Sequence, residues 1–212
     1  MLISFKEAKS SKILLALGLR TFTCSTLLIF LIKLHFFHDN LLEEIKLICF
    51  YGPESTGKST MAKHLAEFYK TEFVPEVARE MISSNNFTLD DIIRIGHAQT
   101  QQIKEKLKTA NQILFCDTDL ITTQIYSRQY LNEVPKILFD LEKQIHYDKY
   151  FLFDIDVPWV ADGLRDLGQQ RAAMIKIFEE ELLKRNIHPV LVKGNWKERE
   201  VMIKDEVNKL LK

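Results

Sequence analysis

Gly52-Pro53-Glu54-Ser55-Thr56-Gly57-Lys58-Ser59-Thr60 is the stretch that decides the fold of this 212-residue chain. It has the form GxxxxGK[ST], follows an apolar run and opens a segment with helical periodicity. Its glycines let the backbone curl, so that successive N–H groups and the helix N-terminus point at phosphate oxygens. We therefore expect residues 52–60, the P-loop, to bind ATP, with Lys58 between the β- and γ-phosphates and the Ser59 hydroxyl on Mg²⁺.

Short apolar runs alternate with longer segments of helical periodicity on both sides of this loop. The runs predicted as strands are 45–50, 73–74, 113–116, 150–155 and 189–192. The segments predicted as helices are 59–69, 89–109, 120–131, 135–145, 170–185 and 197–211. This alternation predicts an α/β fold with a doubly wound, parallel, five-stranded sheet covered on both faces. Ligands of such sheets bind at the carboxyl ends of the strands, so the residues that follow each strand are the candidate site residues.

An acidic pair follows the third predicted strand, in Cys116-Asp117-Thr118-Asp119. Carboxylates at the tip of an apolar strand beside a P-loop have the form of a Walker B site. Residues two apart on a strand point the same way, so Asp117 and Asp119 are expected to share one face. Asp117 is the predicted catalytic and magnesium residue. For Asp119, contact with the substrate and capping of the next helix both stay open.

A second acidic position follows the second predicted strand, where Glu76 and Arg79 lie three residues apart on the expected first turn of a helix. A carboxylate there could orient or deprotonate a hydroxyl group of the phosphate acceptor. The alternative is an interaction of Glu76 with the helix dipole and a surface ion pair with Arg79.

The segment 154–171 has the pattern of a lid. Gly163 and Gly168 flank Arg165, and Arg171 opens the next helix. Arginines on a lid neutralise charge that develops on a transferred phosphoryl group, and a closed lid excludes water. The alternative is a solvated charged loop. After the last strand, Asn195 and Trp196 are expected to flank the adenine, although Trp196 could equally anchor the final helix in the core.

Four stretches together resemble the ribosylnicotinamide kinase family, the kinase domain of NadR-type proteins of NAD salvage. They are GPESTGKST at 52–60, PEVARE at 75–80, CDTDLITTQIYS at 116–127 and DVPWVADGLRDLG at 156–168. The resemblance implies a P-loop fold of the nucleoside and nucleotide monophosphate kinase type, with a lid. It also implies Glu76 and Asp119 as acceptor-side residues, beside Arg79, and Arg165 and Arg171 as lid arginines.

The implied activity is phosphorylation of nicotinamide riboside to nicotinamide mononucleotide, with ATP and Mg²⁺ as cofactors and Lys58, Asp117, Glu76 and Arg165 as catalytic residues. Two departures from the family are visible. About forty residues before the kinase domain are too few for the adenylyltransferase domain of bifunctional members, so we expect no second activity, and Pro75 and Val77 flank Glu76 where some relatives carry aromatic residues. Tyr126, Tyr130 or Trp159 would then have to stack on the substrate. The alternatives are a kinase for another nucleoside or small alcohol, and a regulatory P-loop ATPase, against which the lid arginines argue.

Composition limits the partners. Lys plus Arg equals Asp plus Glu at 29 each, so no overall positive field attracts nucleic acid or an anionic membrane, and a small-molecule nucleoside is the expected partner. The 3 cysteines include no CxxC pair, which favours a reducing compartment. A need for ATP adds to the expectation of a cytoplasmic protein.

The first 42 residues differ from the rest, because Leu, Ile and Phe dominate 13–32 around a single Arg20. A transmembrane helix, a signal peptide without a small-x-small cleavage site and a wrongly assigned start of translation are three open interpretations. The globular pattern begins at Glu43 and uses nothing upstream. We therefore expect the kinase domain at 43–212 and a leader at 1–42 that does not belong to the fold.

Overall fold

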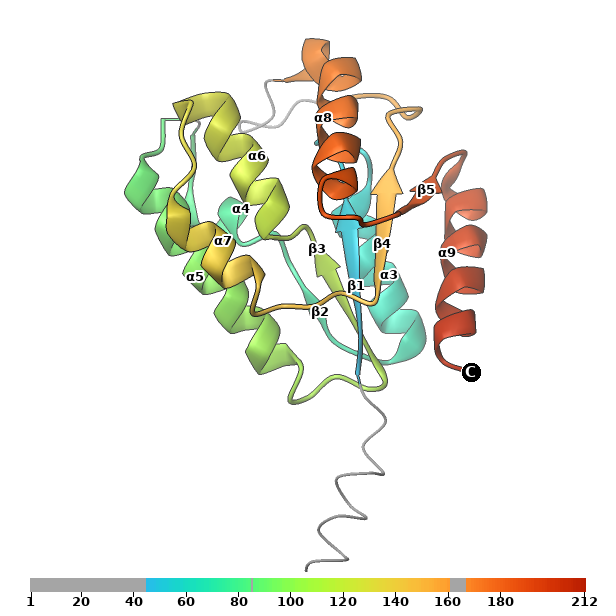
Figure 1. Ribbon diagram of the computed structural model, residues 1–212. Helices are drawn as coiled ribbons and strands as arrows, with labels where there is room; N and C mark the ends of the chain where they lie inside the picture. The colour runs from blue at the N-terminus through green and yellow to red at the C-terminus, as the bar shows by residue number, and fades with distance from the viewer. Residues whose placement is uncertain (1–44, 85, 161–166) are drawn as a thin grey trace, which may run out of the picture. The chain divides into compact units, whose positions relative to one another are not determined.

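The computed structural model describes residues 45–84, 86–160 and 167–212 (Figure 1). The expectations for residues 1–42 and for Arg165 therefore lie outside the described residues. The strands are β1 (Lys46–Tyr51), β2 (Phe73–Val74), β3 (Ile113–Asp117), β4 (Lys149–Phe153) and β5 (Val190–Val192). The helices are α3 (Lys58–Tyr69), α4 (Ala78–Met81), α5 (Leu89–Lys106), α6 (Leu120–Leu131), α7 (Lys136–Glu142), α8 (Arg171–Leu183), preceded by the 3-10 turn η1 (Gly168–Gln170), and α9 (Trp196–Leu210).

The five strands form one parallel sheet in the order β2-β3-β1-β4-β5, which confirms the predicted fold class. β1 lies in the centre and pairs with β3 on one side and β4 on the other. The strands that follow β1 in the chain lie on both of its sides, β2 and β3 on one and β4 and β5 on the other. The carboxyl ends of β1 and β3 lie side by side, with Phe50 opposite Asp117. This register places the acidic strand end directly beside the P-loop.

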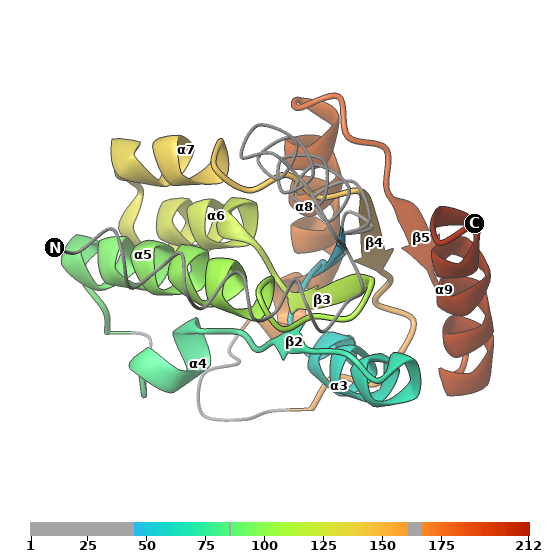
Figure 2. The same ribbon diagram turned by 90° about the horizontal axis from the view of Figure 1, so that it is seen from below.

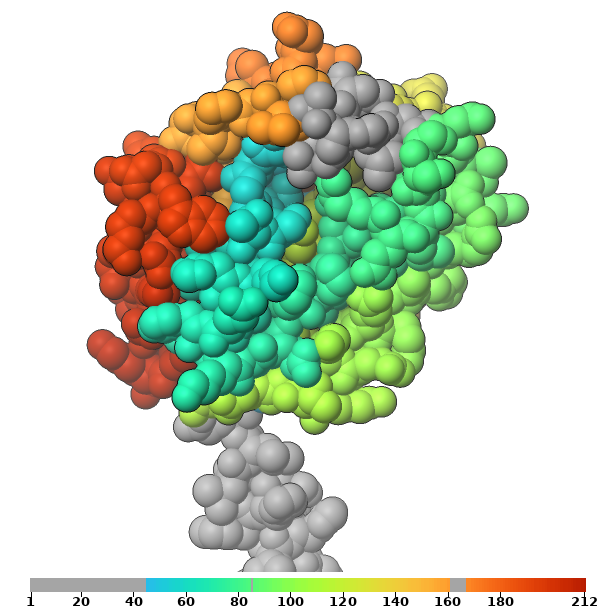
Figure 3. Space-filling model, turned by 180° about the vertical axis from the view of Figure 1, so that it is seen from behind, coloured from blue at the N-terminus to red at the C-terminus, as the bar shows by residue number. Residues whose placement is uncertain are grey.

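Alternate residues of β1 face two different helical layers, as the two-residue period of a strand requires. Ile48 and Phe50 pack in a core with α3 and α9, whereas Cys49 and Tyr51 pack against α6 and α8. Figure 2 shows α3 and α9 on one side of the sheet and α5, α6, α7 and α8 on the other. Figure 3 looks onto the first of these faces, where the red α9 lies beside the cyan α3.

The differences from the sequence prediction lie at the ends of elements. β4 ends at Phe153 instead of residue 155, and α5 ends at Lys106 instead of residue 109. β5 begins after Pro189, which has no N–H to donate to the sheet. The short α4 begins at Ala78, so Glu76 precedes the helix and the prediction that it lies on the first turn is wrong. Among the described residues no helix is both long and apolar enough to span a bilayer.

Candidate active site

The P-loop runs from the end of β1 to the start of α3. It lies close to β4 and is closed by hydrogen bonds to its own Pro53 carbonyl oxygen. Gly52 has a φ of 130°, and a Cβ atom there would lie 2.9 Å from the carbonyl oxygen of Phe153, so only glycine fits. The Thr56 hydroxyl and the Lys58 Nζ donate hydrogen bonds to the carbonyl oxygen of Pro53, at 2.9 and 2.7 Å. Lys58 is thereby held across the loop, with its ammonium group at the position expected for contact with phosphate.

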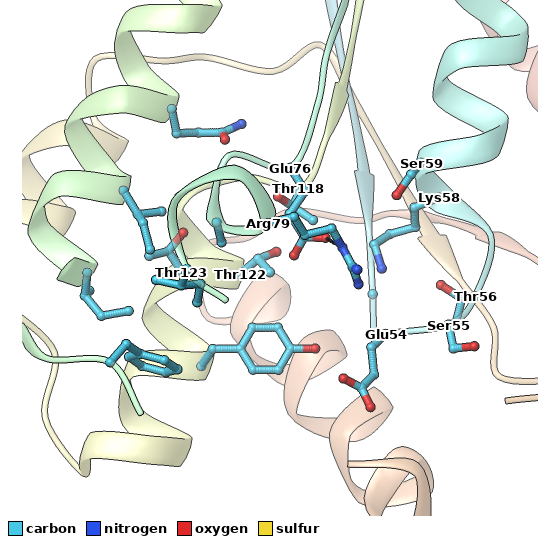
Figure 4. A pocket seen from close by; sticks show the side chains of 18 of the residues that line it. Glu54, Ser55, Thr56, Lys58, Ser59, Glu76, Arg79, Thr118, Thr122 and Thr123 are labelled. Atoms are coloured by element: carbon cyan, nitrogen blue, oxygen red, sulfur yellow. Dashed lines mark hydrogen bonds and ion pairs between the residues drawn. The ribbon is translucent and has the colours of Figure 1, made fainter. Parts of the chain in front are cut away.

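One cavity is lined by most of the predicted phosphate-site residues and by much more (Figure 4). On one side lie the P-loop residues Gly52 and 54–60, without Pro53. On another side lie Glu76, which follows β2, Arg79 of α4 and Thr118, which follows β3. The side chains of Arg79 and Lys58 point toward one another across the cavity in Figure 4. The cavity therefore joins the P-loop to the predicted acceptor side.

Glu76 and Arg79 form an ion pair inside this cavity, with 2.6 Å between Oε2 of Glu76 and Nε of Arg79. The Arg79 backbone N–H also donates to the Glu76 carbonyl oxygen, which closes a turn before α4. The side chains are only 21% and 31% exposed, so the pair belongs to the cavity wall and is not a surface pair. The Glu76 carboxylate is consequently held in one orientation beside the P-loop.

Asp117 is buried at the tip of β3, and among the described residues neither of its carboxylate oxygens has a hydrogen-bond partner of good geometry. Burial away from water and the nearby charge of Glu76 raise its pKa to about 6, although Lys58, the Ser59 hydroxyl and Arg79 favour its ionised form. A buried carboxylate beside a hydroxyl is a suitable partial ligand set for Mg²⁺, which takes oxygen ligands and keeps phosphate oxygens and waters in its shell. The described residues contain no group of three or more His, Cys, Asp or Glu side chains that could hold a metal by themselves.

Asp119 takes the second of its two expected roles, the cap of the next helix, and not the acceptor-side role that the resemblance implies. Thr118 has a φ of 71°, which ends the strand and turns the next residue away from the face of Asp117. Oδ1 of Asp119 accepts hydrogen bonds from the backbone N–H and the hydroxyl of Thr122, at 2.9 and 3.0 Å, and Oδ2 accepts from the Tyr150 hydroxyl at 3.0 Å. Both oxygens are satisfied and the residue is absent from the cavity wall, so we assign Asp119 to the cap of α6.

The predicted lid residues that the structure describes contact the P-loop rather than the cavity. The Trp159 Nε1 and the Leu167 backbone N–H both donate to Oε1 of Glu54, at 3.2 and 3.0 Å. The Val160 N–H donates to the Ser55 hydroxyl oxygen at 2.8 Å. Trp159, which was expected to contact the acceptor, is instead bonded to Glu54 of the P-loop.

Arg171 is buried and donates from its guanidinium to the carbonyl oxygens of Val157, at 2.9 Å, and Ser55, at 3.4 Å. It thus supports the outer side of the loop instead of lining the cavity. The expected Arg165 contact with phosphate falls in 161–166, outside the described residues.

Asn195 and Trp196, expected near the adenine, separate in role. The Asn195 side chain caps α9 by accepting from the N–H groups of Lys197 and Glu198. Trp196 is 43% exposed and lines a second hollow, on the other side of the P-loop, together with Thr56, Gly57 and Val157. Because Trp196 lines this hollow, it remains a candidate contact for the base of ATP. Its exposure argues against the alternative that it anchors the final helix in the core.

Arg199 was missed by sequence reasoning, although its guanidinium makes hydrogen bonds to several groups beside the P-loop. Its buried guanidinium donates to the carbonyl oxygens of Thr56 at 2.7 Å, Gly194 at 2.8 Å and Asp154 at 3.2 Å, and it pairs with Asp156. An arginine inside a charged helix gives no signal of these contacts in the sequence, because they join three segments that are far apart along the chain.

An apolar chamber forms the end of the cavity away from Lys58. It contains Tyr126 and Tyr130, both expected as stacking candidates, and it also contains residues that sequence reasoning missed: Ile82, Phe87, Ile92, Ile95, Gln99, Thr122 and Thr123. The rings of Tyr126 and Tyr130 lie 6.3 Å apart at an interplanar angle of 27°. The helical spacing of Ile92, Ile95 and Gln99 was the one available signal, since it places them on a single face of α5.

The sequence matches a protein family described as an AAA domain over residues 47–199. It is similar to the trifunctional NAD biosynthesis/regulator protein NadR of Salmonella typhimurium, with 33% identity over 159 residues, and to that of Escherichia coli, with 32% over 158 residues. Each match covers 70% of this chain and 38% of the relative, so the chain spans well under half the length of these relatives. The predicted resemblance to NadR-type proteins is thereby confirmed.

Solved structures support the same fold. A crystal structure of NadR protein in complex with NR has a TM-score of 0.69 at 23% identity and covers 78% of this chain and 51% of that one. Deoxyadenosine kinase from M. mycoides has a TM-score of 0.57 at 15% identity, and thymidylate kinase from Ehrlichia chaffeensis one of 0.52 at 17%. These two matches cover 77% and 79% of this chain and 99% of each kinase. The fold is that of the P-loop kinases.

Proposed function

The chain belongs to the AAA domain family, whose match spans residues 47–199, and we propose that this member is an ATP-dependent kinase for nicotinamide riboside. The observation that carries the proposal is the single cavity that runs from the P-loop past Glu76 into the apolar chamber. Such a cavity offers one end to a triphosphate and the other to a flat aromatic ring. The similarity to NadR proteins, one of which was crystallised with NR, supports this choice of acceptor.

In the proposed reaction the acceptor's 5′-hydroxyl oxygen bonds to the γ-phosphorus of ATP while the bond from that phosphorus to the bridging oxygen breaks. ADP leaves, and the hydroxyl proton passes to the Glu76 carboxylate. The ion pair with Arg79 holds Glu76 for this role. Lys58 and the N–H groups of the P-loop stabilise the negative charge of the phosphoryl group during its transfer. Stabilising this charge is the main catalytic demand of phosphoryl transfer.

Ser59 and Asp117 are the proposed protein ligands of Mg²⁺. A bound Mg²⁺ would neutralise part of the charge on the β- and γ-phosphates. The buried, unpartnered carboxylate of Asp117 supports this assignment, because such a group is costly unless a ligand completes it. Asp117 and Ser59 by themselves fill only part of a magnesium shell, so the ion is expected to bind together with ATP.

The remaining roles belong to the proposal as well. Arg165 is proposed to contact the transferred phosphate, with Arg171 supporting the P-loop backbone through Ser55. Trp196 is proposed beside the base of ATP. The need for ATP, with Cys49 and Cys116 buried and free, fits a cytoplasmic enzyme.

The test is to incubate the full chain with ATP, MgCl₂ and one nucleoside at a time and to measure ADP release and the phosphorylated product by mass spectrometry. We expect nicotinamide mononucleotide from nicotinamide riboside and little product from adenosine, thymidine or uridine. Strong activity on one of those three with none on nicotinamide riboside would keep the kinase and replace the acceptor. ADP release at the same rate without any acceptor would instead favour a regulatory ATPase.

A further inference from the structure

The side chain of Gln99 places an unpaired hydrogen-bond donor in the wall of the apolar chamber. Gln99 is only 2% exposed, and its Nε2 has no hydrogen-bond partner among the described residues. Its Oε1 accepts a hydrogen bond from the backbone N–H of Val77, at 3.4 Å. No part of the proposed phosphate chemistry uses this amide.

The bond to Val77 fixes which end of the amide faces the chamber. A backbone N–H is only a donor, so the amide oxygen must face it and the NH₂ group must point the other way. On α5 Gln99 lies between Ile95, which lines the chamber, and Ile103, which packs in the core with Val74 and Leu114. Gln99 is the one polar residue that α5 contributes to the cavity wall.

A buried donor without a partner is uncommon in folded proteins, because it loses its bonds to water and gains none in return. The other α5 residues in the cavity wall are Ile92 and Ile95, whose apolar side chains offer no acceptor. An acceptor group on a bound ligand would give the Nε2 of Gln99 the hydrogen-bond partner that it lacks. The Val77 bond also ties Gln99 to the loop that carries Glu76, so both ends of a bound nucleoside would be held by one segment.

We propose that Gln99 determines acceptor specificity by donating a hydrogen bond from Nε2 to a carbonyl-type oxygen on the aromatic ring of the acceptor. This inference rests on the proposed function, and in nicotinamide riboside the oxygen is that of the carboxamide. Tyr126 and Tyr130 supply the ring surfaces beside it. A site built around a buried donor discriminates strongly against an analogue without the matching oxygen, because the donor is then left unpaired.

Three acceptors that differ only at this substituent test the inference in the full chain. They are nicotinamide riboside, the 3-acetylpyridine riboside, which keeps the oxygen but lacks the NH₂ group, and pyridinium riboside, which lacks both. For the unaltered protein we expect kcat/KM for the acetyl analogue within a few-fold of nicotinamide riboside, and a value roughly tenfold to a hundredfold lower for pyridinium riboside.

Gln99→Met removes the donor at similar length and should bring the ratio of kcat/KM between nicotinamide riboside and pyridinium riboside close to one. Gln102→Met is the matched control, because Gln102 lies one turn further along α5 and lines a separate surface hollow with Phe73 and Pro75. It should keep the ratio of the unaltered protein. The ratio is internal to each variant, so a partial loss of folded protein does not change it.

Each outcome has a definite meaning. Loss of discrimination in Gln99→Met alone supports the inference. Equal use of nicotinamide riboside and pyridinium riboside by the unaltered protein overturns it and leaves the proposed function intact. So does a Gln99→Met variant that slows both acceptors while its ratio stays high, since the side chain then serves only the fold. No phosphorylation of nicotinamide riboside at all overturns the proposed function and this inference together.

Discussion

The indole Nε1 of Trp159 lies 3.2 Å from Oε1 of Glu54, so a residue after β4 is bonded to a variable position of the P-loop. The same oxygen accepts the Leu167 N–H, and the ring packs on Gly168, where a Cβ atom would come within 2.8 Å of the indole. One carboxylate oxygen therefore holds residues from both sides of 161–166. From the sequence Glu54 was expected to bind ATP as part of the P-loop, and the GxxxxGK[ST] pattern gave no sign of its bonds to Trp159 and Leu167.

Removing the acceptor at Glu54 should release the Trp159 ring. In a Trp196→Phe background, where Trp159 is the single tryptophan, we expect Glu54→Ala to shift the fluorescence emission to longer wavelength, because the indole becomes more exposed to water. Glu54→Gln is the control, since its amide oxygen still accepts from the indole N–H. An emission spectrum that is the same for Glu54→Ala and the background would contradict the bond.

Loss of the charged groups at the phosphate end should abolish most of the turnover. We expect Lys58→Ala and Asp117→Asn each to lower kcat at least a hundredfold, which is roughly 2.7 kcal/mol of barrier at ~1.4 kcal/mol per tenfold. The measurement is steady-state ADP release at saturating ATP, with circular dichroism to show that the variants are folded. Near-normal turnover in a folded variant would remove that residue from the site.

Substitution of Glu76 should separate transfer from ATP binding. Glu76→Gln keeps the size of the side chain but removes the base, and we expect kcat to fall by roughly a hundredfold or more. The dissociation constant of ATP, from fluorescence titration, should change little because the P-loop and Asp117 are intact. Glu80→Gln serves as control, since Glu80 lies exposed on the neighbouring α4. A large loss of ATP affinity in Glu76→Gln would assign Glu76 to the nucleotide instead.

The raised pKa of Asp119 leads us to expect that its contribution to the free energy of unfolding decreases as the pH rises. Burial, opposed by hydrogen bonds from Thr122 and Tyr150, raises its pKa from 3.8 to about 6. The folded protein therefore binds a proton that the unfolded chain releases between these values, so this group's contribution to stability is present at low pH and is lost as pH rises through about 6.

Asp119→Asn should remove this contribution while the α6 cap remains, because asparagine caps helices as well as aspartate. We expect its unfolding free energy at pH 7 to equal or exceed that of the unaltered protein, whereas Asp119→Ala should lose about 1–2 kcal/mol. Urea unfolding at several pH values measures both. Kinase activity should persist in Asp119→Asn. A large loss of activity without a loss of stability would return Asp119 to the substrate site.

The sheet, its parallel strands and the P-loop were predictable from the sequence, because buried strands of a parallel sheet appear as apolar runs and the loop has a fixed residue pattern. The site was predictable only where a residue follows a strand directly, as with Glu76 and Asp117. Asp119 was misplaced by the two-residue period, which fails once Thr118 adopts a positive φ. Gln99 and Arg199 depend on contacts with Val77 and Thr56, and no local pattern reports contacts between distant segments.

The bond from Arg199 to the Thr56 carbonyl has a consequence for how the protein is made. The P-loop leaves the ribosome early, yet part of its backbone is held by α9, the last of the described elements to be synthesised. A nascent chain in which α9 has not yet left the ribosome lacks this support. It also lacks the contacts of the same guanidinium with Asp156 and Gly194. Tight nucleotide binding should therefore begin only after α9 has been synthesised and has packed beside the P-loop, so a growing chain without α9 would neither trap ATP nor hydrolyse it.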